Sequence, residues 1–332
     1  MEAGGMVDEH TSYIIEQLTL RKLEYVRGLL KAIDLPYSGP RPKVRERLAD
    51  AIDSNCIDVA TLQALLDELD AWGDQRVRIG RLSTSMLAAF QSADAIAHKV
   101  TEAGMSHLLR GEVNLVPPLD LTPMKVCYEE QAGRKQLRLV AAKTRRLMLP
   151  QPDIPDHVDR RYPGVVFKPF KVETQKVLAF AEISLDNGLT LISTTLLRQG
   201  QGYIAEFGEF FAVFRPLISL TEVEVVPLYN ATHQIRQLPV NEVQIVARQA
   251  KTSVGGNILF RSHSAYADIR ADPELDQTQA ALPNAPGSHC NCFWEPVNGL
   301  EERVHTHVFA PEGEISLFGQ VREASARYVL QR

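Results

Sequence analysis

The chain has 332 residues, of which 45% are hydrophobic and 23% charged, and its formal net charge is −5. This composition is close to the globular average, which excludes a disordered, collagen-like or disulfide-scaffold chain, and the length favours two or three domains. The acidic N-terminus lacks the basic-then-apolar pattern of a signal peptide, and the sequence has no run of 18 uncharged apolar residues. Four cysteines are too few for a secreted disulfide framework. We therefore expect an intracellular protein without a membrane segment.

Charge is unevenly distributed along the chain. Residues 21–49 contain eight Lys or Arg and three acids, a net charge of +5, and residues 133–176 contain eleven bases and four acids, a net charge of +7. The other 259 residues therefore carry a net charge of −17. Two basic blocks on an acidic chain are typical of phosphate contact at defined places, whereas one such block alone is equally consistent with a solvated face.

The N-terminal third of the chain has a helical pattern. Asp58 is a suitable N-cap for a helix over 59–72, whose leucines recur every three or four residues, and Gly73 is a suitable end. A further helix, capped by a serine, is predicted over 83–103. A proline-rich stretch then interrupts the pattern, so we expect a helical domain over 10–111.

Strand-like segments follow, rich in β-branched and aromatic residues. The predicted strands are 125–129, 136–149, 165–171, 177–185, 189–196, 210–214 and 223–228. Asp186-Asn187-Gly188 predicts a hairpin turn, because Asn and Gly accept positive φ. We expect a β-rich domain over 124–255 and a β-rich segment over 256–332 with a final helix at 321–330. The predicted fold class is α+β, with a helical N-terminal domain followed by a mainly antiparallel β-rich body.

Residues 18–53 are the most informative segment. The apolar stripe of an amphipathic helix begins at Leu23, an extended connection over 34–41 follows, and a second short helix begins near Pro42. These two helices bury little surface alone, so we expect them to rest on the helix over 59–72. The bases expected to contact phosphate are Lys31, Arg41, Lys43, Arg45 and Arg47.

This segment resembles the SAP-box family of small DNA-binding modules. The matching positions are Leu23, Val26, Leu30, Leu35, Pro36, Ser38, Gly39, Arg41, Val44, Arg47 and Leu48. The departures are Asp34, where the family usually has glycine, and the prolines at 40 and 42. The resemblance implies binding to double-stranded DNA. Independently of it, amides at the start of a helix beside Arg41 and Lys43 form a phosphate site; the alternative is a helical hairpin that supports the fold or binds protein.

The second basic block has six bases and no acid within 13 residues. Its members are Arg134, Lys135, Arg138, Lys143, Arg145 and Arg146. Strand alternation puts Lys143 and Arg145 on one side and Arg146 on the other. We expect this strand block to be a second phosphate contact, and the alternative is that edge-strand cations oppose aggregation.

The order of the predicted domains shows a second, weaker resemblance to a known family. A basic helical N-terminal domain, followed by a strand-rich domain with Ser193–Arg198 after a hairpin, is similar to the centromere protein N family. That family binds nucleosomes. The likeness implies contact with DNA by the β-rich domain.

The third candidate site is a cysteine and histidine cluster near the C-terminus. Its members with zinc-ligand chemistry are Cys290, Cys292, His305 and His307. Strand residues two apart point the same way, and Asn298-Gly299 is a suitable turn between the two pairs. Pairing about this turn would place Cys290 opposite His307 and Cys292 opposite His305, which predicts a structural zinc site. The alternatives are a hairpin with packed thiols and imidazoles, and a catalytic metal.

The sequence indicates no particular reaction. It has no Gly-rich phosphate loop followed by Lys-Ser or Lys-Thr, and no Gly-x-Ser-x-Gly elbow. We therefore predict a cytoplasmic or chromosome-associated protein that binds nucleic acid, most of all double-stranded DNA, through phosphates and with little sequence readout. Two alternatives are a metal-dependent hydrolase or nuclease that uses the Cys/His cluster, and an adaptor for other protein subunits of a DNA-associated complex.

Overall fold

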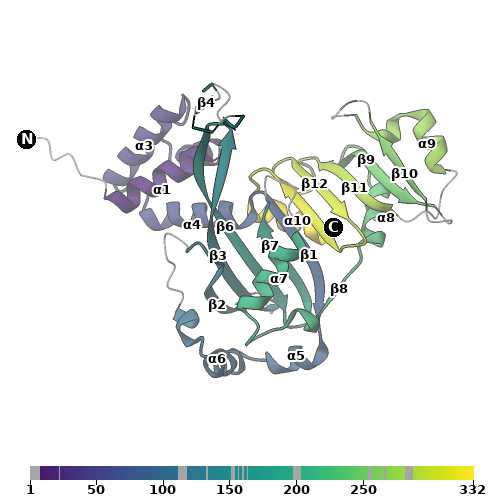
Figure 1. Cartoon of the computed structure of the whole chain (residues 1–332), viewed down its shortest axis with the longest axis horizontal. Helices are drawn as coiled ribbons and strands as arrows, with labels where there is room; N and C mark the ends of the chain where they lie inside the picture. The colour runs from purple at the N-terminus through teal and green to yellow at the C-terminus, as the bar shows by residue number, and fades with distance from the viewer. Residues whose placement is uncertain are drawn as a thin grey trace, which may run out of the picture. The chain divides into compact units, whose positions relative to one another are not determined.

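The structure, a computed structural model, consists of N-terminal helices followed by a largely antiparallel sheet with further helices, which confirms the α+β class (Figure 1). The residues it describes are 8–21, 23–110, 118–131, 134–150, 154–155, 157–158, 161–162, 164–196, 203–252, 256–262, 264, 267–280 and 287–332. No helix within these ranges combines the length and the apolar character needed to cross a membrane.

Contacts divide the chain into two compact units. Unit 1 comprises Met1–Gln75, Tyr229–Val308 and Ser316–Arg332, and unit 2 comprises Arg76–Leu228 and Phe309–Ile315. These boundaries differ from the three ranges expected from composition, because each unit is assembled from segments that are far apart in the sequence.

The N-terminal part of unit 1 is a helical bundle. Its helices are α1 (Glu9–Leu20), α2 (Leu23–Ala32), α3 (Arg41–Asp53) and α4 (Val59–Trp72). All of them contribute to one apolar core, which includes Ile14, Leu30, Leu48 and Leu66. Asp58 caps α4 as predicted, accepting from the Thr61 amide at 2.5 Å. Helices α2 and α3 share this core with α4, while their closest backbone contacts are with α1 and with each other.

The rest of unit 1 is built on strands in the order β10-β9-β11-β12. The elements are α8 (Tyr229–Gln237), β9 (Val243–Lys251), β10 (Asn257–Arg261), η3 (Ile269–Ala271), α9 (Pro273–Ala280), β11 (Gly287–Trp294), β12 (Val304–Phe309) and α10 (Glu323–Gln331). Strand β9 pairs antiparallel with β10 and with β11. The predicted final helix is α10.

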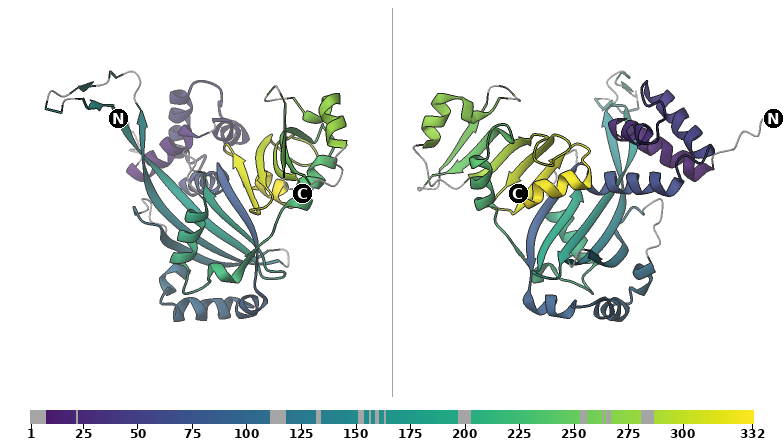
Figure 2. Two further views of the ribbon diagram at one scale, coloured as in Figure 1. Left: turned by 45° about the vertical axis from the view of Figure 1, so that its right-hand side comes forward. Right: turned by 180° about the vertical axis from the view of Figure 1, so that it is seen from behind.

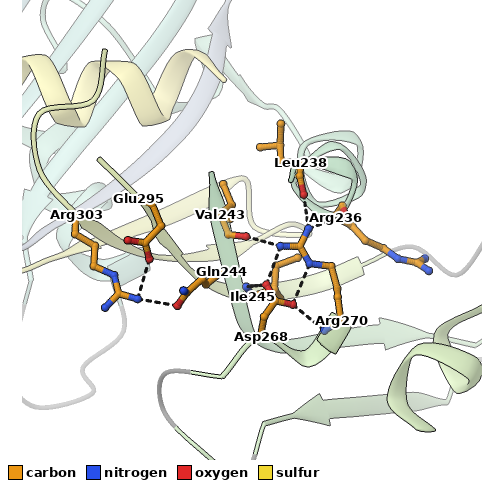
Figure 3. A network of polar contacts seen from close by, with 9 residues as sticks. All are labelled: Arg236, Leu238, Val243, Gln244, Ile245, Asp268, Arg270, Glu295 and Arg303. Carbon is orange, nitrogen blue, oxygen red and sulfur yellow. Dashed lines mark hydrogen bonds and ion pairs between the residues drawn. The ribbon is translucent and has the colours of Figure 1, made fainter. Parts of the chain in front are cut away.

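A polar network fastens α8 to β9 (Figure 3). The Arg270 guanidinium donates to the backbone carbonyls of Arg236, Leu238 and Val243, and to the Asp268 carboxylate. Asp268 also accepts from the Ile245 amide at 2.9 Å. These bonds satisfy carbonyl groups where α8 ends, so one arginine joins a helix terminus to a strand.

Unit 2 has strands in the order β1-β7-β6-β3-β2, with β8 paired to β1. Its elements are β1 (Gln75–Leu82), α5 (Thr84–Ala89), α6 (Ala93–Glu102), η1 (Ser106–Arg110), β2 (Thr122–Gln131), β3 (Arg134–Pro150), β4 (His157–Val158), β5 (Val166–Phe167), β6 (Phe170–Ser184), β7 (Leu189–Thr195), α7 (Tyr203–Val213), η2 (Leu220–Glu222) and β8 (Val223–Val225). Strand β13 (Glu314–Phe318) is divided between the units. Side chains from α5–α7 and the sheet form the core, including Phe90, Ile96, Leu139 and Phe210.

Several elements differ from the sequence prediction. The predicted strand over 210–214 is wrong, because these residues lie in α7 and at its end, where buried phenylalanines recur at helical spacing. The single helix over 83–103 is also wrong: Phe90 ends α5, and Ser92 caps a separate helix, α6. Strand β1 was not predicted. The predicted turn at Asp186-Asn187-Gly188 is confirmed, with Gly188 at φ +72° between β6 and β7.

Candidate nucleic-acid interface

Backbone hydrogen bonds fix the end of α2, where its connection to α3 begins. Asp34 adopts a left-handed φ of +57°, and the Leu35 amide donates to the Leu30 carbonyl at 2.9 Å. This is the geometry that usually selects glycine after a helix. Asp34 therefore ends α2 in the left-handed conformation, although it is not a glycine.

Three arginines donate hydrogen bonds to backbone carbonyls in or near the extended loop. Two of the acceptors belong to the loop, and the third belongs to α1. Arg27 donates to the Gly39 carbonyl at 2.9 Å, Arg47 donates to the Ser38 carbonyl, and Arg41 donates to the Thr19 carbonyl at 2.6 Å. Arg41 and Arg47 are two of the predicted phosphate contacts. Part of their donor capacity is thus used within the protein, which orders the loop ahead of any ligand.

The other predicted bases of this module are exposed. Lys31, Lys43 and Arg45 all project from the surface of α2 or α3. Helix α3 begins after Pro40, which has no side-chain acceptor for the first amides of the helix. Unsatisfied amides at a helix N-terminus attract anions, and cations beside them add to that attraction. We refer to Lys31, Lys43, Arg45 and the first turn of α3 as the module surface.

The second basic block is divided between ion-paired and exposed side chains. Lys143 lies 2.9 Å from Glu206 and 2.5 Å from Glu209, both on α7. Burial lowers the pKa of the Lys143 ammonium, but hydrogen bonds to Glu209 and Glu206 outweigh burial, so its pKa lies above the usual value. Arg138 lies 3.7 Å from buried Glu182. These two bases have carboxylate partners within unit 2.

The remaining members of the block differ in exposure. Arg134 and Arg146 are exposed, whereas Lys135 and Arg145 are half-buried. Arg145 and Arg146 line a cavity of about 400 Å³ together with Lys143 and the two α7 glutamates. Among the bases predicted to contact phosphate at Lys143–Arg146, Arg146 is therefore the most accessible to a ligand.

Arg146 lies on a two-stranded extension of the sheet, which we call the ribbon: residues 143–150 of β3 paired with 170–177 of β6. The register of β2 with β3 extends to Ala142, and β7 pairs with β6 from Ala179 onward. In Figures 1 and 2 the two teal strands continue past their neighbours towards β4. Neither the ribbon nor its exposed apolar residues can be predicted from the sequence, because composition does not show where neighbouring strands end.

The predicted convergence of the Cys/His cluster is wrong. His289 lies beside His307, and the His305 Nε2 lies 2.7 Å from Asn291 Oδ1, so the strands pair one residue away from the register expected from the turn. A shift of one residue turns every side chain to the other face.

The two thiols accordingly lie on the face opposite the imidazoles. Cys290 and Cys292 are buried, and Cys292 Sγ lies 3.2 Å from Thr306 Oγ1. A hydrogen bond with Cys292 and complete burial raise the pKa of the Cys290 thiol, which favours its protonated form. Among the described residues no group of three or more His, Cys, Asp or Glu is arranged to hold a metal ion. Zinc binding therefore stays a prediction that this geometry does not support.

Comparison with protein-family models finds no match for the sequence, and comparison with curated protein sequences also finds none. The resemblances to the SAP box and to the centromere protein N family therefore rest on the residues named above.

Proposed function

We propose that this chain binds double-stranded DNA through phosphate contacts, with little readout of base sequence. The observation that carries the proposal is the module surface: exposed Lys43 and Arg45 near the uncapped N-terminus of α3, and exposed Lys31 in the last turn of α2. The bonds of Arg27, Arg41 and Arg47 support it further, because a pre-ordered loop loses less entropy on binding. Exposed Arg134 and Arg146 supply further positive charge on β3.

The test is reversal of charge on the module surface. We expect the triple variant Lys31→Glu, Lys43→Glu, Arg45→Glu to bind a duplex at least tenfold more weakly near 0.1 M salt. Each lost phosphate contact lowers the slope of log K against log[salt] by about 0.9, so the slope falls by roughly 2.7. Arg41 is left unchanged because its bond to the Thr19 carbonyl supports the fold.

The matched control reverses three exposed bases that lie outside both basic blocks: Arg110, Arg215 and Arg261. The control has the same net charge as the test variant, so a general effect of acidity changes both equally. Equal affinity of the test variant and the unmodified protein, or equal loss in the control, contradicts the proposal. Parallel titrations with single strands and with duplex RNA establish which nucleic acid is preferred.

A further inference from the structure

The ribbon is a sheet extension without a third strand. Its register runs from Lys143 paired with Val177 to Pro150 paired with Phe170, eight residue pairs and roughly 26 Å. Among the described residues no other strand pairs with either edge over this length. Near the start of the ribbon the Thr144 amide donates to the Pro118 carbonyl at 2.6 Å. Fewer strands support the ribbon than support the part of the sheet that β2 and β7 flank, so a ligand that covers the ribbon would stabilise it.

One face of the ribbon carries exposed apolar side chains at the end farthest from β2 and β7. Side chains alternate along a strand, so position 148 of β3 shares a face with its partner position 172 of β6. The exposed fractions are 58% for Met148, 58% for Val172 and 43% for Phe170, which lies at the end of β6 nearest this pair. Large apolar side chains gathered on a surface mark a binding site more often than single ones do.

The charge beside these side chains is positive. Arg146, which alternation puts on the face of Met148, is exposed, and so is Lys168, which lies two residues before β6. Lys171 is exposed as well, but it pairs with Leu149 and so belongs to the opposite face. Glu173 is the one acid in the sequence of 143–150 and 164–177, and it pairs with Leu147 rather than with a position on the apolar face. Two acids, Glu206 and Glu209, line a cavity with Arg146, but they lie on α7, and both contact Lys143. Exposed apolar and cationic groups on one face of the ribbon match a ligand that combines phosphates with apolar surface.

We propose that the ribbon lies in the major groove of duplex DNA, with Met148, Phe170 and Val172 against base edges. The major groove is about 12 Å wide and admits a two-stranded β-ribbon, and the thymine methyl group is the apolar feature that it presents. Arg146 and Lys168 contact the phosphates that flank the groove. This inference rests on the proposed function and adds to it a second, apolar contact.

The first measurement needs no protein variant. The full chain is titrated with a mixed-sequence duplex and with the same duplex in which uracil replaces every thymine, which removes the C5 methyl groups. We expect about threefold weaker binding, or more, to the uracil duplex, because apolar contacts with the methyl groups are lost. Equal affinity for the two duplexes overturns the ribbon inference while leaving the proposed function intact. If the protein binds neither duplex, the proposed function itself is wrong.

The second measurement uses the variant Met148→Gln, Phe170→Gln, Val172→Gln, which replaces each apolar side chain with a polar one that has no methyl group to contact thymine. We expect it to bind the thymine duplex about as weakly as the unmodified protein binds the uracil duplex, and to make no distinction between the two. Val225→Gln with Leu259→Gln, two exposed strand residues elsewhere, is the control and keeps the preference. If the ribbon variant keeps full DNA affinity but changes a dimer into a monomer in light scattering, the ribbon is a protein interface and the inference fails.

Discussion

Asp34 ends α2 in a left-handed backbone conformation that favours glycine. A non-glycine residue at φ +57° is strained, and glycine removes most of that strain. We expect Asp34→Gly to raise the free energy of unfolding by about 0.5–1 kcal/mol, measured by urea denaturation. Gly39→Ala, at φ +123°, is the opposite case and should lower it. A loss of stability in Asp34→Gly would mean that the Asp34 side chain stabilises the loop more than its backbone strain costs.

His305 gives the structure a predictable response to acid. Its ring stacks between Phe293, at 4.3 Å, and Phe318, at 4.6 Å. Burial, together with the charge of Arg303, lowers its pKa from the ordinary 6.5. The unfolded chain therefore binds the proton more readily, so the contribution of His305 to stability decreases as the pH falls below about 6.5.

The matched variant for this pH dependence is His305→Phe, which keeps a ring between its neighbours and removes the titrating group. We expect the unmodified protein to show a steeper decrease in free energy of unfolding between pH 7 and pH 5 than the variant does. Urea titrations at several pH values measure the difference. Identical slopes in the two proteins would show that the His305 pKa is the same folded and unfolded.

On the element scale, strand β3 carries two kinds of base: some form ion pairs within the fold, and others are exposed to a ligand. Lys143→Met leaves Glu206 and Glu209 without their cation, and we expect it to lower the free energy of unfolding by about 1–2 kcal/mol. Arg146→Gln should change stability by less than about 0.5 kcal/mol and weaken DNA binding instead. Thermal unfolding and duplex titration of both variants test this division. If Lys143→Met weakens DNA binding at full stability, the original prediction of Lys143 as a phosphate contact stands.

Helices, strands and turns can be predicted from the sequence where neighbouring residues alone determine them. Asp58 and the leucine spacing of α4 act within one helix, and the turn before β7 needs only Asn187 and Gly188. For the last residues of helix α7 the sequence predicts a strand, because phenylalanine favours strands. The spacing of these phenylalanines by three and four residues is nevertheless helical. The register of β11 with β12 depends on packing across the sheet, and a one-residue difference reversed the faces of the Cys/His cluster.

On the scale of the whole chain, the two basic blocks were visible in the sequence, but which cations are open to a ligand was not. Lys143 and Arg138 form ion pairs with acids that folding brings near them, Glu206 and Glu182 among them, whereas the Arg146 side chain is exposed. Strand β1 was missed for the same reason: its arginines suggest a surface segment. Their carboxylate partner, more than two hundred residues away in the sequence, permits their burial.

That partner is Glu314, which connects the two separate segments of unit 2. Its carboxylate accepts from Arg76 Nε at 2.7 Å and from Arg78 Nε at 2.9 Å, and all three side chains are almost fully buried. The guanidinium of Arg76 also lies 3.6 Å from the centre of the Phe309 ring. We expect Glu314→Gln to lower the free energy of unfolding by about 3–5 kcal/mol, because it removes the carboxylate charge that both buried guanidinium groups contact.

Glu312→Gln is the control for this prediction, since Glu312 lies two residues away and is exposed. A change at an exposed site without buried partners should stay within about 0.5 kcal/mol. Chemical denaturation followed by circular dichroism compares the two variants in the full chain. A similar small effect of both would mean that water or rearranged side chains compensate the arginines, and that the return of residues 309–315 to unit 2 depends on apolar packing rather than on this ion pair.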